Sequence, residues 1–587
     1  MKNKLLLFLA FLFFQNIITH AQNDEILPHV LTPNEVIKIT DSPEYSPENS
    51  LYTDPPPGEV RTMAEWEELQ GLAIAWTGND DIKNILKDII RYAKEEVEVY
   101  IVCSSSAVVI NQLPSDISLD NITFVETSFN SIWIRDYGPN TVYVNDVDSP
   151  YMIDWIYNRN RPADDTIVPP AIAAMVDIPI YETSDCDNNL DLVHTGGNFM
   201  NDGMGRAFSS KLILDENSFP DNQFGCTFKT EAEVLSIMNT FMGIDEYVLM
   251  ENLPYDPIDH IDMHMKLLDE ETLLVGQYPE GVADGPEIEA NLQFILDNYM
   301  TPYGRPYDVV RIPMPPQNGN YPDSNPEGDY RTYANAVFVN KTVLLPIYEE
   351  QYDTTAIRIW EEALPGYKIR GINCNKIIGL NGAIHCITKE IGVKEPLLIN
   401  HSKVRVGCML QDQVVEATVQ HKTGIEEVTL FYSTDTTGSY QTLAMTNTTG
   451  NTWSTTIPAT NEETEMFYYI QATANDGKQI NRPMVAPEGY FHYDVSDCTV
   501  ATEDLEIGIS LENIYPNPAN NYINVTKEDG VKDINITIYN PVGQILFYEQ
   551  DISSYDKQID ISSYASGLLF IKIESNNNSF TYKLLKQ

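Results

Sequence analysis

The candidate nucleophile in the sequence is Cys386, within Asn381-Gly382-Ala383-Ile384-His385-Cys386-Ile387-Thr388. A cysteine attacks carbon only as the thiolate, and a nearby positive charge favours that form. A protonated histidine or a bound planar cation could supply the charge. The same segment also fits a buried structural cysteine, and on its own it does not separate the two readings.

His260-Ile261-Asp262 places an imidazole and a carboxylate two residues apart. If the segment is a strand, both side chains point to one face, where they could move a proton and bind a cation. His264 extends the pattern to H-x-D-x-H, so a metallohydrolase using His260, Asp262 and His264 stays an alternative.

Two further segments could bind the charged parts of a ligand. Asp136 follows Trp133 just before a predicted turn, which suits a planar cation held by the carboxylate and stacked on the indole. Arg159 and Arg161, in an otherwise acidic chain, could form a fork for a carboxylate. Each pattern also fits ordinary structural or solvated charges.

A weak internal repeat indicates how these residues could be brought together. Strand–turn–strand patterns begin at residues 198, 265 and 336, which are 67 and 71 residues apart. A unit that recurs in this way favours a closed ring of like modules. Equivalent positions then converge at one end of the axis. The residues near the hairpin starts are Asp136, Asn198, His260, Asp262, Asn335 and Cys386, and we expect them to share one pocket.

The rest of the chain divides by pattern. Amphipathic helices are expected at 82–95 and 356–364 among β-rich runs. Residues 403–497 show strands and turns only, with Asn475-Asp476-Gly477 as a turn, which predicts an immunoglobulin-like sandwich at 400–497. A last small β domain is expected at 510–587.

The N-terminus and the charge bear on location. Lys2 and Lys4 precede an apolar run and a small-residue cleavage site before Gln22, which predicts a signal peptide at 1–21 and then a proline-rich leader or linker at 22–60. No other segment is apolar enough for a transmembrane helix. The net charge of −50 argues against nucleic acid and anionic membranes as partners and would attract a cationic substrate.

The seven cysteines contain no CxxC pair, which argues against a zinc ribbon. Export permits disulfides, and the odd count leaves at least one thiol over unless it pairs between chains. Cys386 is the candidate for that thiol.

Seven segments, in order, resemble the Porphyromonas-type peptidylarginine deiminase family of the guanidino-group-modifying superfamily, which is related to agmatine deiminases. They are AEWEELQGLAIAW, WIRDYGP, YNRNRP, HTGGNFMNDG, HIDMHMK, YANAVFVN and NGAIHCIT. The terminal pattern YPNPA…IYNPVGQ…SGLLFIKI resembles the sorting domain of the type IX secretion system. The resemblance implies an α/β catalytic domain at 61–395, built as a five-module pseudo-symmetric β/α propeller, and a secreted or cell-surface protein that meets the secretion machinery.

The resemblance also implies roles for the candidate residues. Cys386 would be the nucleophile, His260 the general acid and base, Asp136 and Asp262 the guanidinium ligands, and Asn335 a residue that positions the nucleophile segment. Arg159 and Arg161 match a pair that binds the carboxylate of a C-terminal arginine. No metal or organic cofactor would be needed, and the substrates would be arginine-containing peptides or proteins.

YNRNRP and the export signals favour a peptide over agmatine. Other hypotheses remain. One is an exported agmatine or free-arginine deiminase, and another is an inactive unit carried by a surface adhesion protein.

Overall fold

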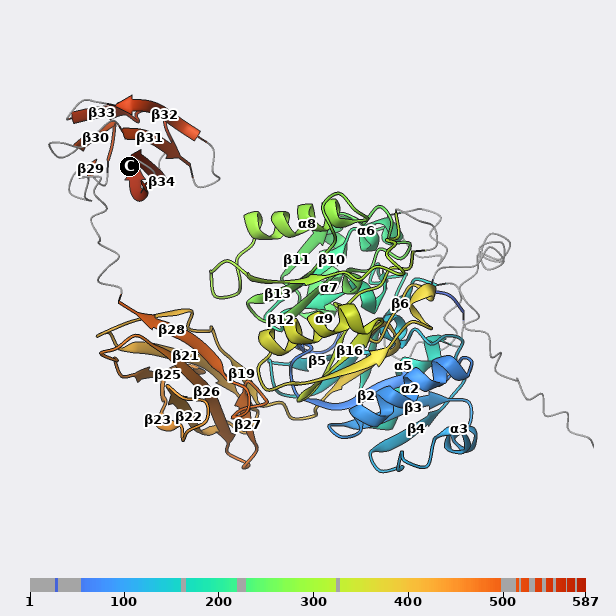
Figure 1. Cartoon of the computed structure of the whole chain (residues 1–587). Coiled ribbons are helices and arrows are strands. Elements are labelled where there is room, and N and C mark those ends of the chain that lie inside the picture. Colours follow the sequence, from blue (N-terminus) through green and yellow to red (C-terminus); the bar gives the residue numbers. More distant parts are fainter. Residues whose placement is uncertain are drawn as a thin grey trace, which may run out of the picture. The chain divides into compact units, whose positions relative to one another are not determined.

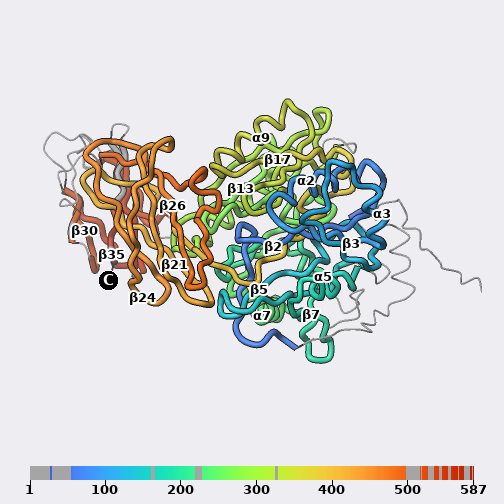
Figure 2. The backbone as a smooth tube through the Cα atoms, turned by 90° about the horizontal axis from the view of Figure 1, so that it is seen from below, coloured from blue at the N-terminus to red at the C-terminus, as the bar shows by residue number. Residues whose placement is uncertain are grey.

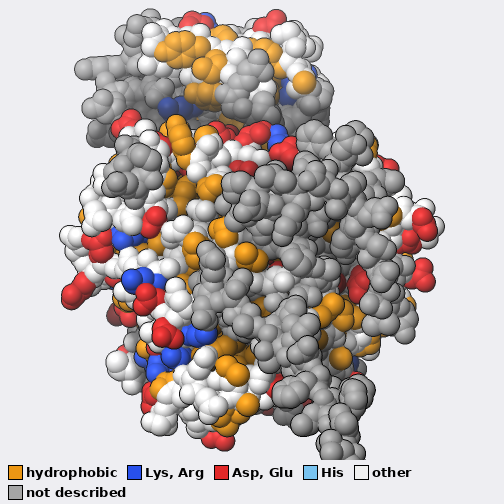
Figure 3. All heavy atoms as spheres, turned by 90° about the vertical axis from the view of Figure 1, so that its right-hand side faces the viewer, with side chains coloured by type: hydrophobic (Ala, Val, Ile, Leu, Met, Phe, Trp, Pro, Cys, Tyr) orange, Lys and Arg blue, Asp and Glu red, His pale blue; other side chains and the backbone are white. Residues whose placement is uncertain are grey.

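A computed structural model describes residues 27–29, 54–159, 165–218, 228–323 and 328–497, and shorter stretches between 514 and 586. The predicted signal peptide lies outside the described residues. The chain forms two compact units: one holds nearly all residues up to 494, and the other is mainly 495–587. None of the described helices is both long and apolar enough to cross a membrane. Aspartate and glutamate side chains recur around the face drawn in Figure 3, with fewer lysines and arginines among them.

Five sheets of the first unit share one strand pattern. In each, two strands pair antiparallel, and a third strand pairs in parallel with the second of them. The antiparallel pair is a hairpin in four of the sheets, and in the fifth it joins β18 (Lys389–Gly392) to β2 (Leu69–Ala75) from the two ends of the domain. For example, β12 (Met265–Asp269) pairs antiparallel with β13 (Thr272–Gln277), and β13 pairs in parallel with β14 (Asp308–Pro313). The hairpins predicted from residues 198, 265 and 336 are confirmed. The other four sets are β5 (Asn140–Val144), β6 (Pro150–Tyr157) and β7 (Ile180–Thr183); β9 (Met200–Asn201), β10 (Arg206–Ser210) and β11 (Glu246–Met250); β15 (Val337–Val339), β16 (Thr342–Ile347) and β17 (Lys368–Asn373); and β18 (Lys389–Gly392), β2 (Leu69–Ala75) and β3 (Glu98–Cys103), extended by β4 (Ile122–Glu126).

The helices lie between the second and third strands in sequence, and four of the five pack on two sheets. Helix α8 (Gly285–Asn298) contacts β13 of its own sheet and β11 of the preceding one (Figure 1). Helix α9 (Glu350–Ala363) likewise contacts β16, β17 and the preceding β14. The same holds for α2 (Asp80–Ala93) on β3, β16 and β17, and for α5 (Val168–Val176) on β7 and β4. Helix α7 (Glu231–Met242) contacts β7 and β1 (Val60–Thr62), which both belong to the preceding sheet.

Local sequence explains where these helices begin. In α2, buried Ile82, Ile85, Leu86 and Ile89 recur at helical spacing, and the Asn79 side chain accepts a hydrogen bond from the Ile82 N–H at 3.2 Å. The helix predicted at 82–95 is therefore confirmed with slightly earlier ends. The helix predicted at 356–364 begins earlier, at Glu350. The sequence pattern did not predict the first turn because that turn is acidic and lacks the apolar period that marks the later turns.

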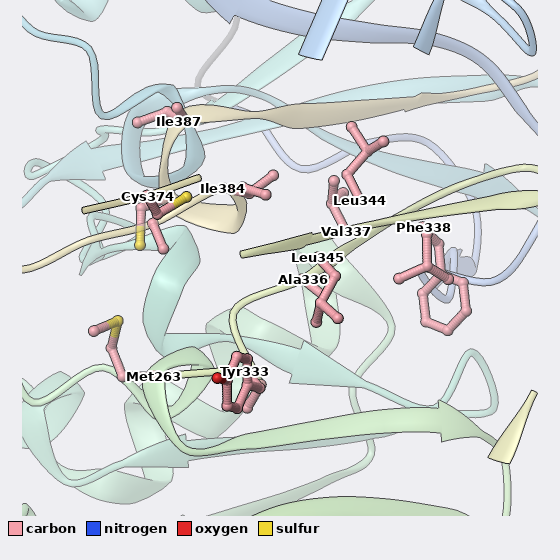
Figure 4. Packing of buried hydrophobic residues seen from close by; sticks show 14 of the residues in the cluster. Met263, Tyr333, Ala336, Val337, Phe338, Leu344, Leu345, Cys374, Ile384 and Ile387 are labelled. Atoms are coloured by element: carbon pink, nitrogen blue, oxygen red, sulfur yellow. The ribbon is translucent and has the colours of Figure 1, made fainter. Parts of the chain in front are cut away.

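The segment around Cys386 is anchored in the main hydrophobic core. Figure 4 shows Ile384 and Ile387, which flank Cys386 and His385, in one cluster with Val337 and Leu344. All four side chains are almost fully buried. Close packing on both sides of the cysteine fixes the main chain at this point.

Residues 403–497 form strands with no helix, as the pattern predicted. One sheet has the order β19 (Leu398–Asn400), β21 (Gln413–Gln420), β25 (Thr452–Ile457), β24 (Thr446–Thr449). The tube in Figure 2 shows β21 and β26 in this region. Asn475-Asp476-Gly477 is the turn between β26 (Thr464–Ala474) and β27 (Gln479–Arg482), as expected. The second sheet also contains β20 (Val406–Cys408), β22 (Ile425–Ser433), β23 (Gln441–Ala444) and β28 (Phe491–Ser496).

The second unit has its own small apolar core, which includes Ile523, Ile536 and Ile571. Its strands form a three-stranded and a four-stranded sheet. They are β29 (Ile514–Tyr515), β30 (Tyr522–Thr526), β31 (Ile534–Tyr539), β32 (Ile545–Ile552), β33 (Asp556–Asp560), β34 (Gly567–Ser575) and β35 (Asn578–Lys586).

Candidate active site

The candidate residues lie in short turns directly before the first strands of the hairpins. Asp136 is in α4 (Ile134–Tyr137), Asp262 in the 3₁₀ turn η3 (Ile261–Met263), and Cys386 in η5 (His385–Ile387). Helix α4 packs against η5 and against η2 (Gly196–Asn198), and η2 packs against η3. Segments more than 120 residues apart therefore meet in one buried place.

The expectation that His260-Ile261-Asp262 is a strand is wrong. His260 is extended, but the chain then turns through η3, where the Met263 N–H bonds to the His260 carbonyl at 3.3 Å. The turn changes the direction of the main chain before β12 begins, so the side chains of His260 and Asp262 do not lie on one face of a strand. They reach the same site from either side of the bend. The turn predicted after Asp136 is likewise a single helical turn that includes it.

Asn335 and Asp262 surround the sulfur of Cys386. The amide Nδ2 of Asn335 lies 3.3 Å from Sγ, and its Oδ1 accepts a hydrogen bond from the His385 N–H at 3.0 Å. The Oδ2 of Asp262 lies 3.7 Å from Sγ. A side chain at Gly382 would collide with Trp133, since a Cβ there would lie 2.4 Å from the indole. Glycine thus allows the indole and the cysteine segment to approach.

The surroundings keep the resting thiol neutral. Burial raises the pKa of Cys386 well above its ordinary value, and the negative charges of Asp262 and Asp136 raise it further. The Asn335 side chain acts in the opposite direction. A cation placed between the carboxylates would reverse the electrostatic contribution and favour the thiolate.

The two carboxylates keep their charge despite burial. For Asp136, burial opposes ionisation, but His29 and His260 outweigh it and lower the pKa. Its Oδ1 also accepts a hydrogen bond from the Gly197 N–H at 3.2 Å. For Asp262, burial again opposes charge, and the bond from His385 Nδ1 at 2.7 Å lowers the pKa. The site thus presents two negative charges beside a neutral thiol.

His385 and Glu65 support Asp262, and the sequence reasoning assigned neither a role. The Nε2 of His385 lies 3.0 Å from Glu65 Oε1, and Glu65 also pairs with Lys266. Two features of the sequence could have indicated these roles: His385 is adjacent to Cys386, and Glu65 lies in the motif AEWEELQGLAIAW. This chain of contacts fixes the orientation of the carboxylate nearest to the sulfur.

His260 is fully buried, and burial lowers its pKa to about 4, so the ring is neutral near pH 7. Its Nδ1 lies 3.8 Å from Asp136 Oδ1, and its Nε2 lies 3.4 Å from Thr195 Oγ1. Nδ1 has no hydrogen-bond partner within the described part of the chain. A neutral imidazole with a free nitrogen beside a carboxylate can accept a proton and pass it on.

The remaining candidates differ in their placement. Trp133 is fully buried beside Asp136, and the Arg159 side chain reaches the same site. Arg161 lies outside the described residues. Asn198 is turned away, since its Oδ1 accepts a hydrogen bond from the Ser210 N–H at 2.8 Å. Its neighbour Gly197 contacts the site instead.

A metal set of His260, Asp262 and His264 does not assemble among the described residues. Among the described residues, ligand atoms that lie within 4.8 Å of one another belong to two other groups, His29 with Asp136 and His260, and Glu395 with His421 and Asp476. His264 is buried apart, with neither ring nitrogen hydrogen-bonded in the described structure.

The free thiols among the described residues are Cys103, Cys374 and Cys386, so Cys386 is one of three. Cys186 and Cys408 are in disulfides, and Cys226 and Cys498 lie outside the described residues.

A thiol beside two carboxylates and an imidazole has the groups needed to attack the carbon of a planar, positively charged C–N group. The chain belongs to the Porphyromonas-type peptidyl-arginine deiminase family, whose model matches residues 61–391, more than half of the 587 residues. It is accordingly a hydrolase of the C–N bonds of amidines. A secretion system C-terminal sorting domain matches residues 513–587, which indicates export and a secreted or cell-surface location.

Curated relatives agree with the family. A protein named "Putative agmatine deiminase" from Vibrio parahaemolyticus is 24% identical over 58% of this chain and 99% of its own length. One of the same name from Mycoplasma mycoides is 23% identical over 46% of this chain and 77% of its own. An X-ray structure titled as a "putative agmatine deiminase" aligns with a TM-score of 0.51 and 20% identity, over 59% of this chain and all of the other, which supports the mixed α/β fold.

Proposed function

We propose that the protein is a secreted peptidylarginine deiminase that converts arginine, in particular C-terminal arginine of peptides, into citrulline and ammonia. One observation carries the proposal: the Cys386 sulfur lies 3.7 Å from Asp262 in a buried site that also holds Asp136 and His260. A flat cation with N–H groups around its rim fits between two carboxylates and presents its carbon to the sulfur.

The fold proposal that goes with this function is a five-module ring, a β/α propeller, over residues 61–395. Each module helix packs on the preceding sheet, four of the five also pack on their own, and α5 returns the series from the first module to β4 of the last. This pattern of contacts supports closure. We also propose a signal peptide at 1–21, a leader at 22–60, an immunoglobulin-like domain at 400–497 and a sorting domain at 510–587.

Each side chain receives a role in this proposal. Asp136 and Asp262 bind the guanidinium nitrogens, and Trp133 stacks on its face. Cys386 is the nucleophile and His260 the proton carrier. Asn335 positions the sulfur and donates a hydrogen bond to it, while Arg159, with Arg161, binds the substrate carboxylate.

The chemistry follows from the charges. When the guanidinium neutralises the two carboxylates, the Cys386 proton passes to neutral His260, and the sulfur forms a bond to the guanidinium carbon. His260 then gives its proton to one amino group, the C–N bond breaks, and ammonia leaves. A thiouronium stays on Cys386. His260 next takes a proton from water and the hydroxide adds to carbon. The C–S bond breaks as the proton of the added hydroxyl passes to sulfur, citrulline and the thiol are released, and His260 gives its proton to solvent.

We prefer a peptide substrate to agmatine for two reasons: Arg159 could bind a substrate carboxylate, and the sorting domain indicates that the protein is exported. Agmatine has no carboxylate, so it offers nothing to an arginine at the mouth of the site. The alternative is an exported agmatine or free-arginine deiminase, and the agmatine deiminase names of the relatives favour keeping it as the second candidate.

The test compares citrulline and ammonia formation, as kcat/KM, on a peptide ending in arginine, on agmatine and on free arginine. The proposal expects the peptide to be preferred. It also expects Arg159→Ala to lower kcat/KM on the peptide about 10- to 150-fold, since a charged hydrogen bond contributes about 1.5–3 kcal/mol, and to leave agmatine unaffected. Preference for agmatine together with indifference to Arg159→Ala would establish the alternative.

A further inference from the structure

The described residues include a short segment of the leader, Leu27-Pro28-His29, and it lies in the catalytic site. His29 is fully buried. Its Nε2 lies 2.5 Å from Asp136 Oδ2, and its Nδ1 lies 2.7 Å from the carbonyl oxygen of Asn381. Its ring stacks on Trp133 at 4.2 Å between centroids, with 4° between the planes.

The His29 ring has the properties that the site would recognise in a guanidinium. Both ring nitrogens face oxygen atoms, of the Asp136 carboxylate and the Asn381 carbonyl, where the N–H groups of a planar donor would lie. The ring lies flat on Trp133 and edge-on to His260 at 5.0 Å. A guanidinium in the same place would use the same carboxylate and the same aromatic face.

The main chain of the segment is bound on both sides of the ring. The Trp133 indole N–H donates to the Leu27 carbonyl at 2.9 Å, and the Arg159 Nε–H donates to the His29 carbonyl at 2.8 Å. Arg159 therefore holds a main-chain carbonyl where the proposed function places a terminal carboxylate. Since the chain continues past residue 29, the site accommodates a residue that is not the last of its chain.

A bridging metal ion is the other possible meaning of His29, Asp136 and His260. Ligand atoms that share an ion at about 2.0–2.1 Å lie about 3 Å or more apart. His29 Nε2 and Asp136 Oδ2 instead make a direct hydrogen bond, and the chelator test given below separates the two meanings.

We propose that residues 27–29 bind the active site as an internal pseudosubstrate, with His29 in the position of the target arginine. The subsites they fill define how a peptide substrate binds. The Trp133 indole takes the carbonyl two residues before the target, and Arg159 takes the carbonyl or carboxylate of the target itself. Arginines within a chain are then substrates as well as C-terminal ones. This inference rests on the proposed peptide substrate and extends it.

The segment competes with substrate within the same molecule. Only molecules whose site is open can bind substrate, so the apparent KM equals the intrinsic KM divided by the open fraction, while kcat at saturation is unchanged. The full exported chain carrying His29→Ala is expected to show a KM for an arginine peptide at least about fivefold lower, with kcat within about twofold of wild type.

A second variant tests directly whether residue 29 lies in the active site. In the full chain carrying His29→Arg, the introduced side chain lies over Cys386, and mass spectrometry should find citrulline at position 29 at a rate independent of protein concentration. The matched control is His492→Arg, at a half-exposed position outside the site. There, conversion should be slower and should rise with protein concentration. Adding Cys386→Ala should abolish both.

The outcomes separate this inference from the proposed function. If no variant and no peptide yields citrulline, the proposed function fails. If peptides are converted normally but position 29 reacts no faster than position 492, and His29→Ala leaves KM unchanged, only the pseudosubstrate inference fails. It also fails if a chelator alone reproduces the effect of His29→Ala, because the segment would then be held by a metal.

Discussion

The hydrogen bond from Asn335 to the Cys386 sulfur allows a sharp test of how the nucleophile is activated. The Asn335 Nδ2 lies 3.3 Å from Sγ, and the Oδ1 of the same amide holds the His385 N–H. Asn335→Ala removes both contacts. A hydrogen bond to a charged group contributes about 1.5–3 kcal/mol, so kcat should fall about 10- to 150-fold. KM should change little, because Asn335 holds the enzyme's own sulfur.

Asn335→Asp is the matched comparison. Aspartate has the same shape and keeps an acceptor for the His385 N–H, but it replaces the donor by a negative charge 3.3 Å from the sulfur. At an effective dielectric constant of 20, two charges at that distance repel by about 5 kcal/mol, more than a thousandfold in rate. The expected order of kcat is therefore wild type, then Asn335→Ala, then Asn335→Asp.

The assay is initial-rate citrulline formation at saturating arginine peptide, with thermal unfolding of all three proteins in parallel. A purely structural role predicts the opposite order, because the aspartate retains the shape and the acceptor. Asn335→Asp at least as active as Asn335→Ala would refute the reasoning.

Three further predictions follow from burial and charge. Cys374→Ala and Cys103→Ala should keep kcat within about threefold, because burial alone raises the pKa of the Cys374 thiol, and burial with the charge of Glu126, not that of a site carboxylate, raises the pKa of the Cys103 thiol. Cys386→Ala should abolish citrulline formation. Glu65→Gln should lower kcat about 3- to 30-fold, because a weaker hydrogen bond to His385 lets the Asp262 carboxylate change its orientation. An unchanged kcat in stopped-flow measurements of citrulline formation would exclude a positioning role for Glu65. Burial raises the pKa of Glu216 to about 7 in the folded protein, from about 4.5 in the unfolded chain. The contribution of Glu216 to the free energy of unfolding is therefore fully present below pH 4.5 and is lost as the pH rises through 7, by up to about 3 kcal/mol. Glu216→Gln should therefore raise the melting temperature at pH 8 and change it little at pH 4.5, and equal shifts at both values would contradict the assignment.

Part of the fold and site was predictable because it is periodic. Hairpins starting near residues 198, 265 and 336 indicated a repeated structural module. Repeated modules place Asp136, Asp262 and Cys386 at equivalent positions, each just before the first strand of its module. The turn at 261–263 was missed because a polar–apolar–polar triplet reads equally well as a strand or as one helical turn.

His29 could not be predicted from local pattern. It lies 107 residues from Asp136 in a proline-rich leader, and only tertiary contacts bring it into the site. His385 was quoted within its motif, yet nothing local indicates that its side chain turns toward Asp262. Long-range side-chain contacts of this kind leave no periodic trace in the sequence.

The central claim is that a planar cation between Asp136 and Asp262 turns the neutral thiol of Cys386 into the nucleophile. Two probes of nearly equal size test it: cationic 2-chloroacetamidine and neutral 2-chloroacetamide, whose labelling rates at Cys386 are followed by mass spectrometry. We predict that the cation reacts at least about 100-fold faster, since about 3 kcal/mol of charge-assisted bonding favours it, and that Asp136→Asn or Asp262→Asn reduces the ratio. Equal rates for the two probes in the wild-type protein, or labelling at another residue, would contradict the account.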